Sequence, residues 1–238
     1  KIMLKKKLLF FPLLIVLSTN VTGQAFKGYG GYMVGLWSID WSTINAQISE
    51  AATDFGIGKF DQTLMLNGGG GAANVYNNLF IGGMGFGGST HINGVDTSGV
   101  NRDITVSVTL GGPIVEANFQ PLGKLELILG TGLLFGQTSI RIIKDSGTNS
   151  WDNIWVSFDT QNSPNYLNTT AANRVTVINP YLSLRYPLMP WFGIDLSLGY
   201  NLTLYDPNGW EANGGPLAGK EELGLSRPFF RISLIFGG

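Results

Sequence analysis

His91 is the only histidine of the chain and the first residue to consider for acid–base chemistry. Ser89 stands two positions earlier, so in an extended strand both side chains would point to the same face. A histidine acting as a general base needs a bound nucleophile and an orienting acid, and the nearest acids are Asp96 and Asp103. This arrangement is a weak match to the sites of lipid-modifying enzymes. We therefore expect no catalytic residues, and lipid modification is the least favoured of three hypotheses about function.

Metal and cofactor chemistry lack suitable residues. The chain has no cysteine, which removes thiol catalysis, cysteine-bound metals and disulfides. A single histidine makes a transition-metal site improbable. Glycine clusters such as 68–71 resemble phosphate-binding loops, but a loop of that kind leads into a helix, and here strand-like sequence follows. We expect no cofactor and no bound nucleotide, and a net charge of −1 gives no signal for nucleic acid.

Five charged residues share a pattern of placement. Each falls on the face of an alternating segment that carries the small, polar residues. Glu116 does so only if residues 111–113 form a β-bulge that shifts the register. A lipid-facing Lys or Arg at the bilayer midplane would cost about 2–4 kcal/mol, so we predict that all five point into the lumen of a barrel. There they fill and neutralise the interior or, as the alternative, gate a narrow ion path. The residues are Glu116, Glu126, Arg185, Asp195 and Arg231.

Eight segments with period-two alternation must position these charges. In the seventh, Leu196 and Leu198 share one parity while Asp195 and Ser197 share the other. We predict an all-β fold, an eight-stranded antiparallel up-and-down transmembrane barrel, in which Ser89 and His91 point inward near the outer rim. The expected strands are 27–39, 61–75, 79–92, 103–118, 124–142, 174–186, 191–205 and 226–237.

The predicted connections alternate between short and long. Three are tight turns, at 76–78, 120–123 and 187–190, whereas four are long and polar, at 40–60, 93–102, 143–173 and 206–225. Outer-membrane barrels have short periplasmic turns and longer extracellular loops. This alternation predicts that both ends of the barrel segment lie on the periplasmic side.

Composition favours a membrane barrel over a soluble one. Charged residues make up 13% of the chain, against roughly 25% in soluble domains. A soluble lipocalin-like barrel would turn its apolar face inward and would need a charged exterior, which these strands do not supply. Residues 1–23 resemble a secretory signal, with Lys5 to Lys7 before the apolar stretch 8–17. We expect cleavage before Gln24 and a single barrel domain over 24–238, and a retained anchor helix is the alternative.

The final strand carries a family resemblance. Residues 229–236 read FFRISLIF, similar to the aromatic-terminated last strand that the barrel-assembly machinery recognises, although two glycines follow the last aromatic residue. The whole of 24–238 resembles the small eight-stranded outer-membrane barrels of the OmpA/OmpX type. The resemblance implies the outer membrane of a Gram-negative bacterium, with outer-membrane lipid and the assembly machinery as partners. The residues expected to form the assembly signal are Phe230, Ile232, Leu234 and Phe236.

Three surface features suggest partner binding. Residues 42–55 have helical spacing, which predicts a short helix in the first extracellular loop. The glycine-rich wall of the first three strands either makes room for large inward groups such as Tyr181 or docks a partner barrel or lipid. The expected loop 143–173 carries aromatic residues suited to recognition, or to packing on one another. We therefore expect a non-enzymatic protein that is structural or binds a surface partner, with a narrow pore as the alternative. The loop aromatics are Trp151, Trp155, Phe158 and Tyr166.

Overall fold

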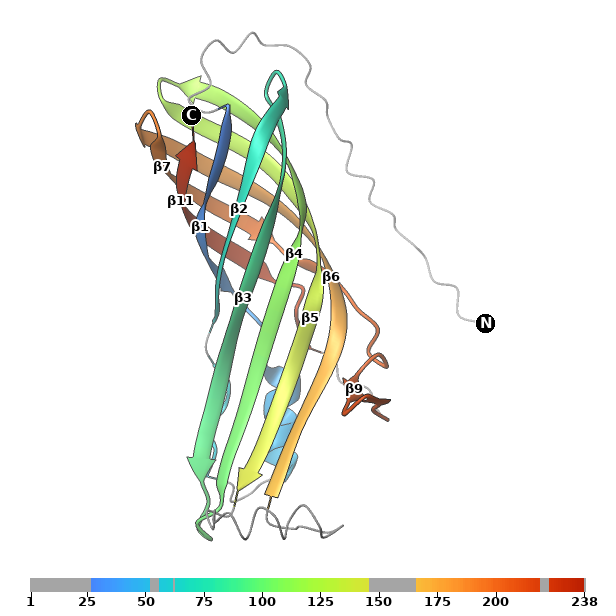
Figure 1. The fold of residues 1–238 in the computed structure, drawn as a ribbon. Coiled ribbons are helices and arrows are strands. Elements are labelled where there is room, and N and C mark those ends of the chain that lie inside the picture. Colours follow the sequence, from blue (N-terminus) through green and yellow to red (C-terminus); the bar gives the residue numbers. More distant parts are fainter. Residues whose placement is uncertain (1–26, 52–55, 62, 146–165, 219–222, 238) are drawn as a thin grey trace, which may run out of the picture.

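The computed structural model describes residues 27–51, 56–61, 63–145, 166–218 and 223–237. Within these ranges, one short helix accompanies strands that belong to a single antiparallel sheet (Figure 1). The elements are β1 (Gly28–Trp37), α1 (Ser42–Ala51), β2 (Leu64–Tyr76), β3 (Leu79–Val95), β4 (Asn101–Leu122), β5 (Leu125–Asp145), β6 (Tyr166–Met189), β7 (Phe192–Tyr200), β8 (Leu202–Leu204), β9 (Glu211–Ala212), β10 (Gly215–Pro216) and β11 (Pro228–Gly237).

The sheet closes on itself into a barrel. Strands β1 to β6 pair in chain order, β6 pairs with β7, β7 with β11, and β11 with β1. In the closing pair, Tyr32 lies opposite Leu234. This ring of eight strands confirms the predicted antiparallel up-and-down barrel. The remaining short strands are additions, since β8 and β9 pair with β6, and β10 pairs with β9.

Side chains on β7 alternate between the lumen and the outer surface as the sequence predicts. Ser197 is 2% exposed and the next residue, Leu198, is 63% exposed. On β4 the bulge predicted at 111–113 does not form, because β4 keeps one register with β5 from Asn101 to Phe119. Val106 and Val108 are buried on the same inward parity as Glu116.

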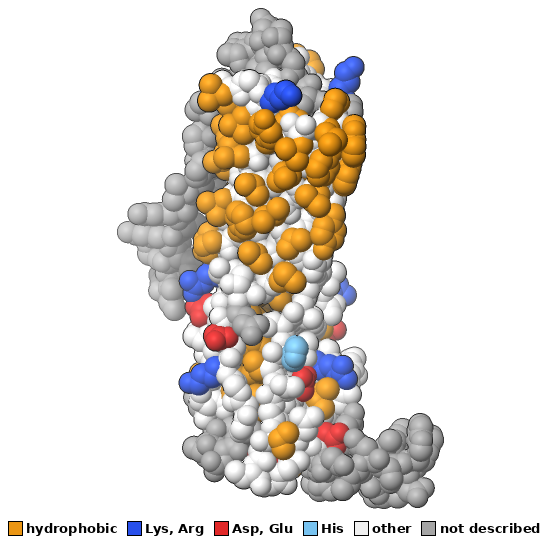
Figure 2. Space-filling view, turned by 90° about the vertical axis from the view of Figure 1, so that its left-hand side faces the viewer, with side chains coloured by type: hydrophobic (Ala, Val, Ile, Leu, Met, Phe, Trp, Pro, Cys, Tyr) orange, Lys and Arg blue, Asp and Glu red, His pale blue; other side chains and the backbone are white. Residues whose placement is uncertain are grey.

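The exposed apolar side chains gather in one half of the barrel, where they form a continuous band (Figure 2). An apolar outside and a polar inside are the opposite of a soluble lipocalin-like barrel and suit contact with lipid.

The height of this band matches a membrane. It runs over residues 125–135 of β5 and 178–188 of β6. At about 3.4 Å per residue and a tilt of about 40°, such segments rise roughly 26 Å along the barrel axis. An outer-membrane barrel carries an apolar band about 25 Å tall, so these segments are long enough to cross.

Four strands continue past the band on the side away from the short turns. Strands β4, β5 and β6 have 22, 21 and 24 residues, against 10 for β1 and β11. Together with β3 they form a sheet that projects beyond the other strands (Figure 1). We call this sheet, residues 88–110, 136–145 and 166–177, the extension.

The extension corrects two expected loops. The connection predicted at 93–102 is only a turn over 96–100, because β3 and β4 stay paired out to Val95 and Asn101. The loop predicted at 143–173 begins after Asp145 and ends before Tyr166, and residues 146–165 lie outside the described part. Polar residues on both faces made these segments look like loops, but strand pairing satisfies their backbone groups beyond the membrane.

The first long connection contains the expected helix. Helix α1 starts where the Ser42 amide donates to Asp40 Oδ1 at 3.1 Å, an N-terminal cap. The Asn45 amide side chain bonds the backbone N and O of Phe60, both at 2.8 Å, and so holds the helix against the returning chain. Residues 52–55 of the predicted helix lie outside the described residues. Among the residues that are described, no helix has the length and apolar character needed to cross a membrane.

Candidate functional site

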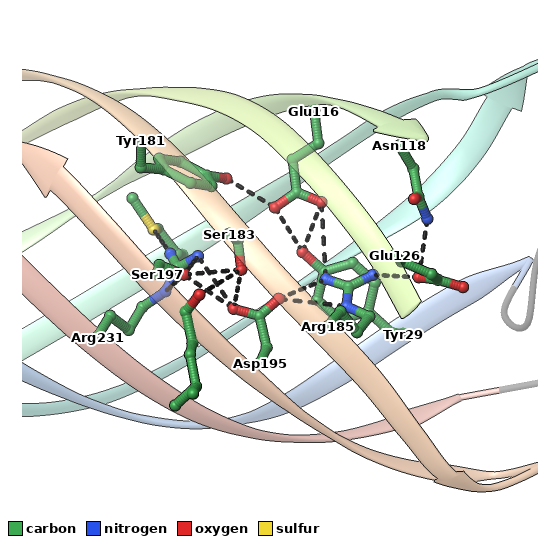
Figure 3. A network of polar contacts seen from close by, with 12 residues as sticks. Tyr29, Glu116, Asn118, Glu126, Tyr181, Ser183, Arg185, Asp195, Ser197 and Arg231 are labelled. Carbon is green, nitrogen blue, oxygen red and sulfur yellow. Dashed lines mark hydrogen bonds and ion pairs between the residues drawn. The ribbon is translucent and has the colours of Figure 1, made fainter. Parts of the chain in front are cut away.

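The polar lumen is built around an ion pair between neighbouring strands. Arg185 of β6 and Asp195 of β7 lie directly opposite each other. Arg185 donates from Nε and Nη2 to Asp195 Oδ2 at 3.2 and 3.1 Å. Both side chains point inward because they take the lumen parity of their strands, and they are 1% and 2% exposed. Figure 3 shows them at the centre of a larger network.

Glu116 of β4 brings two phenols into the network. Tyr29 of β1 donates to both carboxylate oxygens at 2.8 Å, and Tyr181 of β6 donates to Oε1 at 2.7 Å. Arg185 Nη2 lies 3.9 Å from Glu116 Oε2, and its guanidinium covers the Tyr29 ring at 3.8 Å. The carboxylate is therefore satisfied from three sides although it is 1% exposed.

Glu126 lies toward the short turns, beside the same arginine. It pairs across the sheet with Arg185, whose Nη1 is 3.9 Å from Oε2. Asn118 of β4 donates to the same oxygen at 2.9 Å. One guanidinium thus serves carboxylates on β4, β5 and β7.

Arg231 of β11 completes the cluster from the other side. Its Nε and Nη2 donate to Ser197 Oγ at 3.1 and 2.7 Å, and Nη2 lies 3.9 Å from Asp195. The guanidinium sits over the Tyr181 ring at 4.6 Å. Ser183 also donates to Asp195. Hydrogen bonds and ring contacts therefore surround both arginines, as a buried charge requires.

The structure brings all five sequence-selected charges into one cluster and adds five uncharged partners. Sequence reasoning had assigned none of these partners to the cluster, although each takes the lumen parity of its strand. A polar residue with inward parity near a charged one was the signal available. The added partners are Tyr29, Asn118, Tyr181, Ser183 and Ser197.

Apolar side chains fill the lumen on the extension side of the network. Met33, Met84 and Phe86 are at most 5% exposed there. Phe86 meets Phe229 edge to face, with ring centroids 5.6 Å apart. These residues and the network leave the barrel interior packed, an arrangement that favours a filled core over an ion path.

Inward glycines make room for this packing. A Cβ at Gly130 would overlap the Tyr181 ring, and a Cβ at Gly35 would lie 2.6 Å from the Phe229 ring. This supports the interpretation that glycine admits large inward groups.

Other glycines face outward and have a different setting. Gly30 and Gly111 have space for a Cβ, with the nearest atoms 3.8 and 3.7 Å away, whereas a Cβ at Gly85 would lie 3.3 Å from the Leu110 carbonyl oxygen, a tight contact. Gly85 and Gly111 are direct cross-strand partners, and Gly30 faces Gly71. These glycines leave part of the outer wall over β1 to β4 without side chains, although Gly30 and Gly111 could hold one. We call this area the glycine wall.

His91 does not point into the lumen, which corrects its predicted position. His91 and Ser89 are exposed on the outer surface, and Thr90 between them is the inward residue. The prediction failed because several glycines of β3, including Gly83 and Gly85, face outward. On this strand the alternate positions with the smaller side chains are therefore not the ones that face the lumen. Asp96, a proposed orienting acid, instead caps the β3–β4 turn.

Asp96 is held by donors of its own turn. The amides of Ser98 and Val100 donate to Oδ1 at 2.8 and 2.9 Å, and Arg102 Nη1 bonds Oδ2 at 2.5 Å. The Val100 hydrogen bond and the Arg102 side chain hold the pKa of this carboxyl below its usual value. Within the described ranges, no group of three or more His, Cys, Asp or Glu residues could hold a metal ion.

The aromatic loop residues can be placed only in part. Tyr166 is the first residue of β6, opposite Asp145, rather than a loop residue. Trp151, Trp155 and Phe158 lie outside the described residues.

The expected assembly residues line the outer face of β11. Ile232, Leu234 and Phe236 are 42%, 42% and 48% exposed, and Phe230 is half-buried. The Phe236 ring lies 5.3 Å from Phe192 and 6.3 Å from Trp191, between ring centroids. These rings form part of an aromatic girdle at the short-turn end, as at the interfaces of membrane barrels.

Fold, outer band and polar lumen together define the architecture of a small eight-stranded transmembrane β-barrel. No protein-family model matches the chain, and no curated protein matches it. Among solved structures, the chain is similar to Ail, the attachment invasion locus protein of Yersinia pestis. A structure of Ail with the heparin analogue sucrose octasulfate aligns with a TM-score of 0.40 at 12% identity, covering 88% of this chain and 94% of that chain. A second Ail structure aligns with a TM-score of 0.35 at the same identity and coverage.

Proposed function

We propose that this chain is a non-enzymatic surface-binding protein of the outer membrane of a Gram-negative bacterium. The carrying observation is the extension, since β4 to β6 continue as paired strands well past the apolar band. A barrel that only sealed or braced the membrane would not need a projecting sheet. The extension ends at Asp145 and Tyr166, and the sequence between these two residues includes Trp151, Trp155 and Phe158, residue types that suit recognition.

We propose that one segment at each end of the sequence directs export and membrane insertion. In this proposal residues 1–23 are a signal peptide removed before Gln24, and 24–238 form the barrel. The outward apolar row of β11 is the segment that the assembly machinery reads, with Phe236 at its end.

The orientation can be tested with single cysteines, because the chain has none of its own. A membrane-impermeant maleimide added to intact cells should label Thr170→Cys, which is exposed on the extension, and not Leu198→Cys, which lies in the apolar band. Detergent-solubilised, unfolded protein gives the labelling maximum for each variant. Failure to label Thr170→Cys in cells that carry folded protein would contradict an external extension.

A second candidate surface is the glycine wall. The observation in its favour is the room for a Cβ at Gly30 and Gly111, two outward positions at which the packing of the barrel does not require glycine. A smooth wall would let a second membrane protein approach the sheet closely.

Site-specific photo-crosslinking separates the two surfaces. A photoreactive residue at Trp155 reports on the loop, one at Gly111 on the glycine wall, and one at Leu198 on the far side of the band as the control. Discrete protein adducts from Trp155 alone support loop-mediated binding. Adducts from Gly111 alone move the partner to the wall, and equal adducts from all three would contradict both surfaces.

A further inference from the structure

A depression in the outer wall lies where the apolar band meets the extension. It spans β4 to β6 and has a volume of about 590 Å³, with Thr109, Phe135, Gln137 and Arg174 among its lining residues. These four side chains point outward, since their neighbours Val108, Leu134 and Val175 are buried in the lumen. The depression therefore opens on the outer surface of the barrel and not into the lumen.

The strand register orders the depression into rows that change from apolar to polar. Phe135 lies opposite Gly111 and Thr176 at its membrane side. The next row is Thr109, Gln137 and Arg174, and the row beyond it pairs Ser107 with Ser139. One step toward the band, Leu133 lies opposite Ile178, both apolar. The depression thus occupies the level at which lipid tails give way to headgroups.

Arg174 is the only charged residue that lines the depression. It makes no hydrogen bond or ion pair with any residue in the described part of the chain, in contrast to Arg102, Arg141, Arg185 and Arg227. The other lining residues supply hydroxyl groups, the Gln137 amide and the Phe135 ring. Arginine presents a planar set of donors that matches phosphate, and hydroxyls and amides supply further donors.

A missing side chain creates the space. Gly111 faces outward beside Phe135, and a Cβ there would meet no atom closer than 3.7 Å. A Cβ at this position would therefore fit without displacing the strands, and a longer side chain attached to it would extend from the lining of the depression.

We propose that this depression binds the phosphate of an outer-leaflet lipid headgroup, with Arg174 as the anion ligand and Phe135 against the first atoms of the lipid tails. In the orientation of the proposed function the extension lies outside the cell, so the lipid is the phosphorylated glycolipid of the outer leaflet, lipid A. The proposal rests on the membrane orientation of the proposed function and adds a lipid site to it.

Native mass spectrometry of the full-length barrel in detergent, titrated with lipid A, tests the proposal. The wild type should retain one lipid A, and Arg174→Gln should weaken this binding about tenfold or more, the scale of a lost charge-assisted contact. Gly111→Leu, which fills the space and keeps the charge, should weaken it as well. Arg141→Gln is the matched control, an outward arginine of the same sheet that bonds Asn168 outside the depression, and should bind as the wild type does.

Two further probes identify the chemistry. Lipid A without its phosphates should bind the wild type weakly. Its affinity should be no higher than the affinity of intact lipid A for Arg174→Gln. Inorganic phosphate should compete only at concentrations far above those of lipid A, and equal affinity for the free ion would overturn a lipid site. Equal loss in Arg174→Gln and Arg141→Gln, or no loss in either, would also overturn the proposal.

Heat-modifiable gel mobility is measured on every variant to show that the barrel is folded. A folded barrel that does not bind lipid A contradicts the lipid site and leaves the proposed function standing. A protein without a heat-modifiable folded form contradicts the membrane barrel on which the proposed function depends.

Discussion

Arg185 has more ionic partners than any other described lumen residue, since it lies within 4 Å of Glu116, Glu126 and Asp195. Removing one member of a buried ion pair leaves an uncompensated charge, which costs about 3–5 kcal/mol. We expect Arg185→Met to lower the free energy of unfolding by that order, measured by urea titration of the refolded barrel in detergent.

The control for this substitution is Arg227→Ala. Arg227 pairs with Asp40 at the surface, where the side chains are 45% and 35% exposed. Exposed pairs contribute about 0–1 kcal/mol, so this variant should stay close to the wild type. An equal effect of both substitutions would show that the network does not stabilise the barrel.

Gly130 and Gly30 differ in which face of the wall they occupy. A Cβ at Gly130 meets the Tyr181 ring, whereas a Cβ at Gly30 has its nearest neighbour 3.8 Å away. Gly130→Ala should cost about 1–3 kcal/mol through overpacking, and Gly30→Ala should change the free energy of unfolding by less than about 0.5 kcal/mol. The same urea titration compares the two, and a neutral Gly130→Ala would contradict the packed contact between β5 and Tyr181.

At the scale of the element, the β3–β4 turn depends on the ionised form of Asp96. Its hydrogen bonds from Ser98, Val100 and Arg102 lower the pKa of the carboxyl in the folded turn. The stabilisation is therefore full above the ordinary aspartate pKa of 3.8 and is lost as the pH falls through the lowered value.

Amide hydrogen exchange can follow this turn. We expect the Ser98 and Val100 amides to exchange faster at low pH, after correction for intrinsic rates, while amides in the barrel wall keep their protection. In Asp96→Asn this pH dependence should disappear. Persistence of the effect in that variant would assign it to another group.

Several elements could be predicted from the sequence because a membrane barrel imposes a strict period of two. The alternation on β7 and β11 gave the correct faces, and the inward parity selected Glu126, Arg185, Asp195 and Arg231. Glu116 was selected through a bulge at 111–113 that β4 does not form, because the inward residues before it are apolar. Two further features escaped this logic. In β3 the outward side chains are glycines, so size no longer marks the face and His91 was misplaced. In the extension the outer surface is polar, so the sequence pattern of these strands predicted loops.

At the scale of the whole molecule, the packed lumen predicts the absence of steady conduction. The network and the apolar residues beyond it, including Met33, Met84 and Phe229, fill the cross-section of the barrel. In planar bilayers, single-channel recordings of the wild type should show no stable openings. Reproducible openings of fixed conductance, abolished in a mutant of the network such as Arg231→Ala, would instead favour the pore.

The division of charges between the two halves of the chain bears on how the barrel is assembled. Within the membrane-spanning part, β1 to β5 contribute only the carboxylates of Glu116 and Glu126, while Arg185 and Arg231 arrive on β6 and β11 and a third carboxylate, Asp195, arrives on β7. An intermediate inserted only as far as β5 would hold two uncompensated negative charges in a narrow interior, and the arginines of β6 and β11 would relieve that cost. The penalty on stopping early makes insertion close to all-or-none, so a nascent chain truncated after β5 should be left outside the bilayer, open to proteolysis.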